Sequence, residues 1–145
     1  MSKQYEHTQV GYLIIVAMVT TMVLISIILA TSGLNWIAIG VLVIIAIALV
    51  LFSSLTVVIC EEELEVRFGP GLVRKRIKLD EIESCKVVKN RWFYGWGIRL
   101  TPHGVLYNVS GFHAVEIKLR TGKQFRIGTD VPQDLEAAIQ KSLSN

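Results

Sequence analysis

Residues 10–52 read VGYLIIVAMVTTMVLISIILATSGLNWIAIGVLVIIAIALVLF, an apolar block that is broken once, by Thr31-Ser32-Gly33. Segments 10–30 and 34–52 carry no charged side chain, and each is close to the roughly 20 residues that cross a hydrocarbon core as a helix. The short connection requires the two helices to be adjacent and antiparallel. The block therefore predicts a transmembrane hairpin at residues 10–54, with spans at 10–30 and 34–54.

A cleaved signal peptide is the competing interpretation of the first span, because a signal is also N-terminal and apolar. A signal would begin with a more basic segment than MSKQYEH, and its cleavage site would lead to a mature domain. Here Ala30 is followed within a few residues by a second apolar stretch. Tyr12 and Trp36 also lie near the starts of the two spans, where amphipathic rings anchor helices at headgroup depth. The sequence thus favours a retained hairpin.

The distribution of basic residues predicts the orientation of the hairpin. All 15 Lys and Arg residues lie before Val10 or after Phe52, and the loop between the spans has none. Because cytoplasmic flanks are enriched in Lys and Arg, both termini are expected in the cytoplasm. Residues 1–9 are then a short cytoplasmic N-terminus, and residues 55–145 form one small cytoplasmic domain on an integral membrane protein.

The region from Leu55 onward predicts about seven short antiparallel strands followed by a helix. Apolar and polar residues alternate with a period of two in segments 55–59, 64–68, 73–79, 98–100, 105–109, 115–119 and 125–127. After Asp130 the period changes to about 3.6, with an apolar stripe at Leu135, Ala138, Ile139 and Leu143. We expect a curved antiparallel sheet or partly open barrel, closed at one end by the C-terminal helix.

A membrane hairpin, successive strands with an Ile-x-Leu-x-x-Ile segment at residues 77–82, and a C-terminal helix resemble bacterial membrane proteins that carry a pleckstrin-homology-like domain. The resemblance covers residues 55–143. It implies a PH-like binding or assembly module in the bacterial inner (cell) membrane, rather than a catalyst. The first strand pair lacks a Lys and Arg-x-Arg phosphoinositide signature and is acidic instead, with Glu61, Glu62, Glu63 and Glu65.

The segment RWFYGWGIR at residues 91–99 concentrates aromatic and basic side chains. Three interpretations stay open: a belt at the headgroup boundary, a hot spot for a protein partner, or the core of a small sheet with a bulge at the glycines. The arginines would meet phosphates or acidic groups in the first two cases. The candidate contact residues are Arg91, Trp92, Phe93, Tyr94, Trp96 and Arg99.

A second candidate surface is the strand expected at residues 72–79. Alternation places Arg74, Arg76 and Lys78 on one face, where they could contact anionic lipid headgroups. The competing interpretation is a solvated face on which these cations pair with Glu63 and Glu65 of the neighbouring strand.

The sequence predicts no enzyme and no cofactor or metal site. It contains no GxSxG, HExxH or phosphate-cradling motif, and no Cys/His quartet with zinc spacing. Cys60 and Cys85 are expected to be free thiols in a reducing compartment. Nucleic acid binding is not expected, since the basic residues are diluted by 12 acids and lack a stacking motif.

The expected partners are the lipid bilayer and another membrane protein or further copies of the chain. The alternative function is a subunit of an oligomeric pore or transporter, although neither span carries the ionisable residue that usually marks an ion path.

Overall fold

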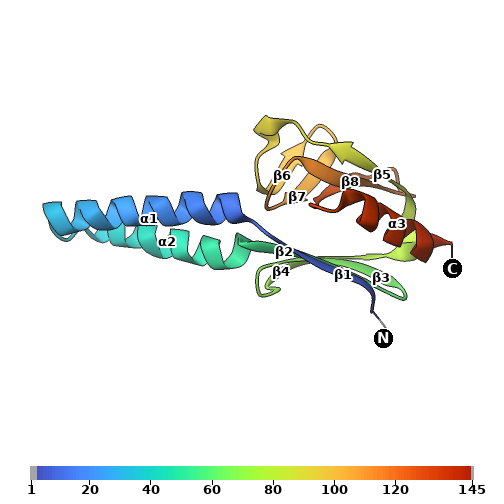
Figure 1. The fold of residues 1–145 in the computed structure, drawn as a ribbon, viewed down its shortest axis with the longest axis horizontal. Helices are drawn as coiled ribbons and strands as arrows, with labels where there is room; N and C mark the ends of the chain where they lie inside the picture. The colour runs from blue at the N-terminus through green and yellow to red at the C-terminus, as the bar shows by residue number, and fades with distance from the viewer. Residues whose placement is uncertain (1–2, 145) are drawn as a thin grey trace.

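The computed structural model describes residues 3–144, which form a long helical hairpin projecting from one end of a two-layered β domain (Figure 1). The elements in chain order are β1 (Lys3–Val10), α1 (Tyr12–Ser32), α2 (Trp36–Phe52), β2 (Ser54–Cys60), β3 (Glu63–Phe68), β4 (Val73–Lys78), η1 (Leu79–Glu81), β5 (Ile82–Lys89), η2 (Trp92–Tyr94), β6 (Gly97–Thr101), β7 (Gly104–Asn108), β8 (His113–Leu119), β9 (Gln124–Gly128) and α3 (Pro132–Leu143).

The two apolar segments are helices, each starting about two residues later than predicted. Within the described residues, α1 is the one helix that is long and apolar enough to cross a membrane by length and composition. The second helix, α2, is equally apolar but has 17 residues. Neither helix contains a buried residue, and large exposed apolar side chains occur from end to end of both. That the pair crosses a membrane as a hairpin stays a prediction.

Polar side chains within the hairpin bond to its own backbone. The hydroxyls of Thr21 and Ser26 donate to carbonyls one turn earlier, at 2.9 and 2.8 Å. The side-chain oxygen of Asn35 accepts from the amides of Ile37 and Ala38 and so caps the N-terminus of α2. These contacts satisfy groups that hydrocarbon would leave unpaired.

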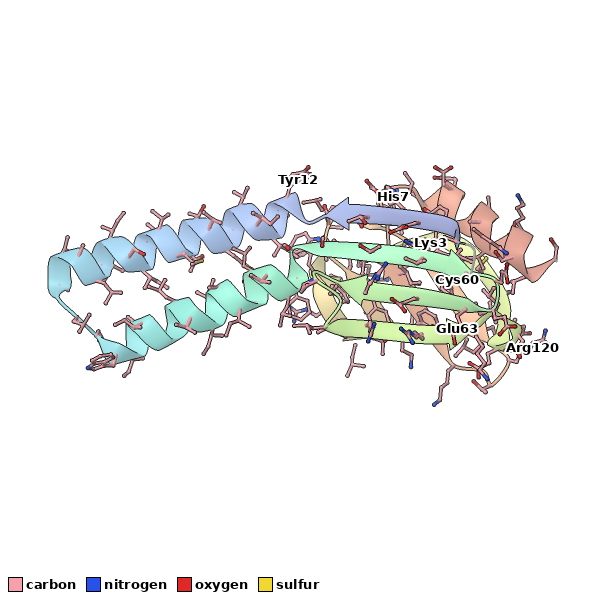
Figure 2. All side chains as sticks on the ribbon, turned by 90° about the horizontal axis from the view of Figure 1, so that it is seen from below. Lys3, His7, Tyr12, Cys60, Glu63 and Arg120 are labelled. Carbon is pink, nitrogen blue, oxygen red and sulfur yellow. The ribbon has the colours of Figure 1, made fainter. Side chains whose placement is uncertain are left out.

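The first sheet has the order β1-β2-β3-β4 and is antiparallel throughout. Its first strand is formed by residues predicted to be a short cytoplasmic tail. Val10 pairs with Ser54 and His7 with Val57, so β1 lies along the full length of β2. The described N-terminal segment is therefore part of the domain, and the hairpin is inserted between two neighbouring strands of one sheet (Figure 2).

The second sheet has the order β5-β8-β9-β7-β6, and its β7 and β9 strands pair in parallel. The prediction of a mostly β domain with a C-terminal helix is confirmed. The described strands form two sheets with no closed barrel, and the one departure from the predicted antiparallel pairing is the parallel pair of β7 with β9. The Thr121-Gly122-Lys123 turn joins β8 and β9, with Gly122 at a φ of 92° that glycine readily adopts.

The core lies between the two sheets and is built from the alternating apolar residues of the strands. It includes Leu55, Ile59, Leu64, Val66, Phe68, Ile77, Val115, Ile117, Phe125 and Ile127. The α3 helix lies between the two layers on one side and adds the buried Leu135 and Ile139 to this core (Figure 1). Pro132 suits the first turn of this helix, and Lys141 in its last turn is favoured by the negative end of the helix dipole.

Candidate functional site

Backbone hydrogen bonds join the β domain to the base of the hairpin. The amide of Gly11 donates to the carbonyl of Ser53 at 2.8 Å, so the β1–β2 ladder continues up to the start of α1 and the end of α2. A side chain at Gly11 would sit 2.7 Å from the carbonyl oxygen of Val109, which directly follows β7 of the second sheet. The amide of Gly69 also donates to Ser54 at 2.9 Å. The hairpin is therefore a continuation of the first sheet rather than a tethered anchor.

The aromatic segment connects the two edge strands of the second sheet. Because β5 and β6 lie at opposite edges, residues 90–96 must pass β8, β9 and β7 to join them. Trp92 is 76% exposed and Phe93 is 58% exposed, whereas Tyr94 and Trp96 are half-buried. The Arg91 guanidinium lies 5.8 Å from the centre of the Phe93 ring, a cation–π distance. Exposure therefore favours a contact role for Trp92 and Phe93, which form an exposed surface, and a packing role for Trp96, which packs inward.

A buried polar network fixes the start of this connection. Arg126 donates a hydrogen bond of 2.9 Å from Nε to Glu116, a second guanidinium nitrogen lies 2.9 Å from the same carboxylate oxygen, and both side chains are less than a tenth exposed. Arg126 also donates to the side-chain oxygen of Asn90 at 3.0 Å. The backbone amide of Asn90 donates to the Phe112 carbonyl at 2.6 Å. All of these groups lie within the described chain, and they hold residue 90 against the sheet face opposite the core.

The sequence pattern does not predict this network. Glu116 alternates with Val115 and Ile117, and such alternation normally places the polar residue in solvent. Glu116 is buried here because the connection at residues 90–96 covers that face. The alternation pattern of β8 does not indicate that another segment covers it. Lys86 adds an exposed partner, with its ammonium 3.5 Å from Glu116.

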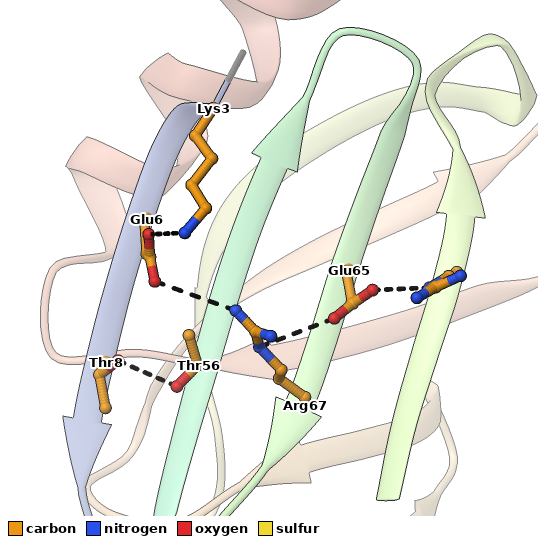
Figure 3. Close-up of polar contacts among 7 residues, drawn as sticks. Lys3, Glu6, Thr8, Thr56, Glu65 and Arg67 are labelled. Carbon is orange, nitrogen blue, oxygen red and sulfur yellow. Dashed lines mark hydrogen bonds and ion pairs between the residues drawn. The ribbon is translucent and has the colours of Figure 1, made fainter. Parts of the chain in front are cut away.

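The predicted cationic row lies on β4, and one of its three members, Arg76, forms an ion pair. Arg76 donates to Glu65 at 2.6 Å, and this hydrogen bond raises the pKa of the Arg76 guanidinium. Glu65 also pairs with Arg67 at 3.6 Å. Arg67 in turn lies 3.9 Å from Glu6, so the chain of ion pairs reaches the N-terminal strand β1 (Figure 3). Hydrogen bonding to Lys3 lowers the pKa of the Glu6 carboxyl. The solvated ion-pair interpretation therefore holds for Arg76.

The row runs along β4 and so leads away from the hairpin. Lys78 lies at the far end, opposite Glu63, and lines an open cavity there with Glu62 and Arg120. Arg74 lies at the near end and lines a smaller cavity of about 170 Å³ with Ile98 and Tyr107. The structure therefore brings Arg74 towards the aromatic segment and separates Lys78 from it.

An apolar cavity lies at the hairpin base. It has a volume of about 590 Å³ and is lined by Ile14, Ala17 and Met18 of α1, Phe52 of α2 and residues 95–99. We call it the hairpin crevice. It brings two candidate residues, Trp96 and Arg99, against the helices, a proximity that their positions in the sequence did not indicate.

The described titratable groups do not assemble an obvious reactive centre. Burial, followed by the nearby Glu136, raises the pKa of the Cys85 thiol to about 11, so the nucleophilic thiolate is disfavoured at neutral pH. His7 contacts Asp130 at 2.6 Å in a partly exposed pair that joins β1 to the segment before α3. Within residues 3–144, no group of three His, Cys, Asp or Glu side chains is placed to hold a metal ion.

No family model, curated protein or solved structure matches this chain. The resemblance to PH-like membrane proteins therefore stays a prediction from the sequence.

Proposed function

We propose that this protein is a non-catalytic binding or scaffold module of the bacterial cell membrane, held at the cytoplasmic face by its helical hairpin and assembling with another membrane protein. Both termini lie in the cytoplasm in this proposal, and the β domain is a PH-like binding unit. The apolar hairpin and its uncharged loop support the anchoring role.

The observation that carries the proposal is the direct passage of two adjacent strands into the two helices. With Gly11 bonded to Ser53, no flexible linker separates the sheet from the hairpin. A domain attached in this way keeps a set orientation to the bilayer, so the same surface always faces the headgroups. Such fixed presentation suits a scaffold better than a freely diffusing binding partner.

The exposed apolar residues at the hairpin end support a contact function. Leu72 is 79% exposed in the turn before β4, next to the Gly69 that closes against α2. Trp92 and Phe93 are exposed on the connection that leads to the hairpin crevice. Aromatic side chains of this kind are enriched at interface hot spots and at headgroup depth. We assign them to contact with a membrane partner at the bilayer surface.

Topology is tested by protease digestion of inverted and right-side-out membrane vesicles that contain the full chain. The β domain should be cleaved in inverted vesicles and protected in right-side-out vesicles. Cleavage from the outside would refute the cytoplasmic placement, and release of the protein by alkaline carbonate would refute the anchor.

Partner binding is tested by purification in mild detergent followed by mass measurement. A stoichiometric second membrane protein that is lost from a Trp92→Ala/Phe93→Ala variant with unchanged folding would support the scaffold. A closed ring of identical copies would favour the pore alternative, and a lone monomer would refute both assignments.

A further inference from the structure

We propose that the hairpin crevice binds one phospholipid of the surrounding leaflet, with an acyl chain along α1 and a phosphate or ester oxygen at Trp96 and Arg99. This inference rests on the membrane insertion of the hairpin in the proposed function. It adds a specific lipid site, which anchoring alone does not require.

The depth of the crevice matches the boundary between headgroups and acyl chains. Ile14 and Met18 follow Tyr12 by two and six positions, which places them roughly 3 and 9 Å along the helix from the start of α1. If α1 enters the bilayer at Tyr12, residues 95–99 lie beside the first two turns inside the interfacial region. The open side of the crevice is then continuous with the lipid-facing surface of the helix.

The size and lining of the crevice fit a lipid segment. Its volume of about 590 Å³ falls within the roughly 300–1,000 Å³ of typical small-molecule sites. Ile14, Met18 and Phe52 give it an apolar wall from the helices, and Ile98 continues that wall on β6. A hydrocarbon chain removes this apolar surface from contact with water.

Two hydrogen-bond donors lack an acceptor at the same place. The indole Nε1 of Trp96 is buried and has no hydrogen-bond partner among the described residues. A buried donor without a partner is destabilising, so an acceptor supplied by a ligand is favoured. Arg99 bonds through Nε to the Trp96 carbonyl at 2.9 Å, and it forms no ion pair within residues 3–144. Its remaining guanidinium donors match a phosphate oxygen.

The commitment to a phospholipid follows from the combination of these features. An acidic peptide would satisfy Arg99 but would not need an apolar wall on a membrane helix. Inorganic phosphate would leave the wall of Ile14, Met18 and Phe52 uncovered. A phospholipid supplies the oxygen acceptors and the hydrocarbon in one molecule.

Lipid retention is measured by native mass spectrometry of the full chain released from detergent after incubation with phosphatidylglycerol, phosphatidylcholine or inorganic phosphate. We expect one retained phospholipid and no retained inorganic phosphate. Ala17→Phe, which fills the crevice, and Arg99→Gln should each reduce retention severalfold. Val16→Phe, which places the same side chain on the exposed face of α1, and Arg120→Gln, at the end of the domain far from the hairpin, are the controls and should retain the lipid. Equal retention by Ala17→Phe and Val16→Phe would overturn the site.

Insertion is read separately from Trp36, which lies at the opposite end of the hairpin. A variant with Trp36 as its single tryptophan and a variant with Trp96 alone are reconstituted with phospholipid brominated near its ester groups. Quenching of both tryptophans, with relief of Trp96 quenching by Ala17→Phe, is the expected result. Quenching of Trp36 without Trp96 would overturn the lipid site alone, and absence of quenching at Trp36 would overturn the membrane anchor itself.

Discussion

Replacing Arg126 with Met should destabilise the protein more than any change of an exposed charge. The Glu116 side chain is 9% exposed, and the substitution removes its 2.9 Å hydrogen bond and its ion pair with Arg126. Removing one partner of a buried ion pair costs about 3–5 kcal/mol, because the other charge stays buried without compensation. Lys86 remains at 3.5 Å and offsets part of this loss. We therefore expect a loss of about 3–4 kcal/mol in the free energy of unfolding.

The assay is denaturant unfolding of the full chain in mild detergent, followed by tryptophan emission and by circular dichroism. Lys86→Met is the matched control, because it removes the other cation that faces Glu116 but is 70% exposed. Exposed pairs contribute about 0–1 kcal/mol, so this control should stay within that range. A double variant, Glu116→Leu/Arg126→Met, should recover part of the lost stability, since no buried charge is left unpaired.

The reasoning would be refuted if Arg126→Met and Lys86→Met lowered the unfolding free energy equally. It would also be refuted if the double variant were less stable than Arg126→Met by a further few kcal/mol, since burial of an unpaired carboxylate would then not be the cause. Limited proteolysis gives a second measurement, because the side-chain oxygen of Asn90 loses its hydrogen bond from Arg126 in this variant. Residues 90–96 should become more susceptible to proteolysis while the strands remain protected.

Three further outcomes are expected. The folded Cys85 thiol titrates near pH 11 and the unfolded thiol near 9, so the unfolded chain binds fewer protons between these values and stability should fall from pH 9 to 11; Cys85→Ala should flatten that slope in thermal melts, and an unchanged slope would contradict the assignment. Gly104→Ala should lower the unfolding free energy by more than about 2 kcal/mol, because its φ is 96° and a side chain there overlaps the backbone of β9. Gly122→Ala shares the positive φ but meets open space, so it should cost about 1 kcal/mol in the same melts, and equal losses would refute the steric argument. Trp92→Ala/Phe93→Ala should leave the melting temperature nearly unchanged, since both rings are mostly exposed, and a large drop would mean that the surface is part of the core.

The sequence predicted the elements whose signals are local. The two apolar helices, the alternating strands and the amphipathic C-terminal helix all follow from residue periodicity, and the structure contains them. The N-terminal strand escaped prediction because its inward-facing residues are Tyr5, His7 and Gln9. These side chains are polar, so their alternation with Glu6 and Thr8 shows no change in hydrophobicity.

Features set by distant parts of the chain could not be predicted from local patterns. The parallel pairing of β7 with β9 depends on the order of five strands, which alternation does not encode. The aromatic segment was recognised as distinctive, but its division into the exposed Trp92 and the half-buried Trp96 depends on where the connection meets the hairpin. The burial of the unpaired indole nitrogen of Trp96 likewise depends on the packing of residues 95–99 beside α1, which local patterns do not encode.

The position of the hairpin between β1 and β2 has a consequence for biogenesis. The first sheet cannot be completed until residues 3–10 and 54–60 are on the same side of the membrane, because they pair along their whole length. On the proposed topology, a chain that inserts only one helix leaves β2 as an open edge, which is prone to pairing with other chains. Assembly of the β domain thus acts as a built-in check on insertion, and incorrectly inserted molecules should be recognisable by quality-control proteases through that unpaired strand.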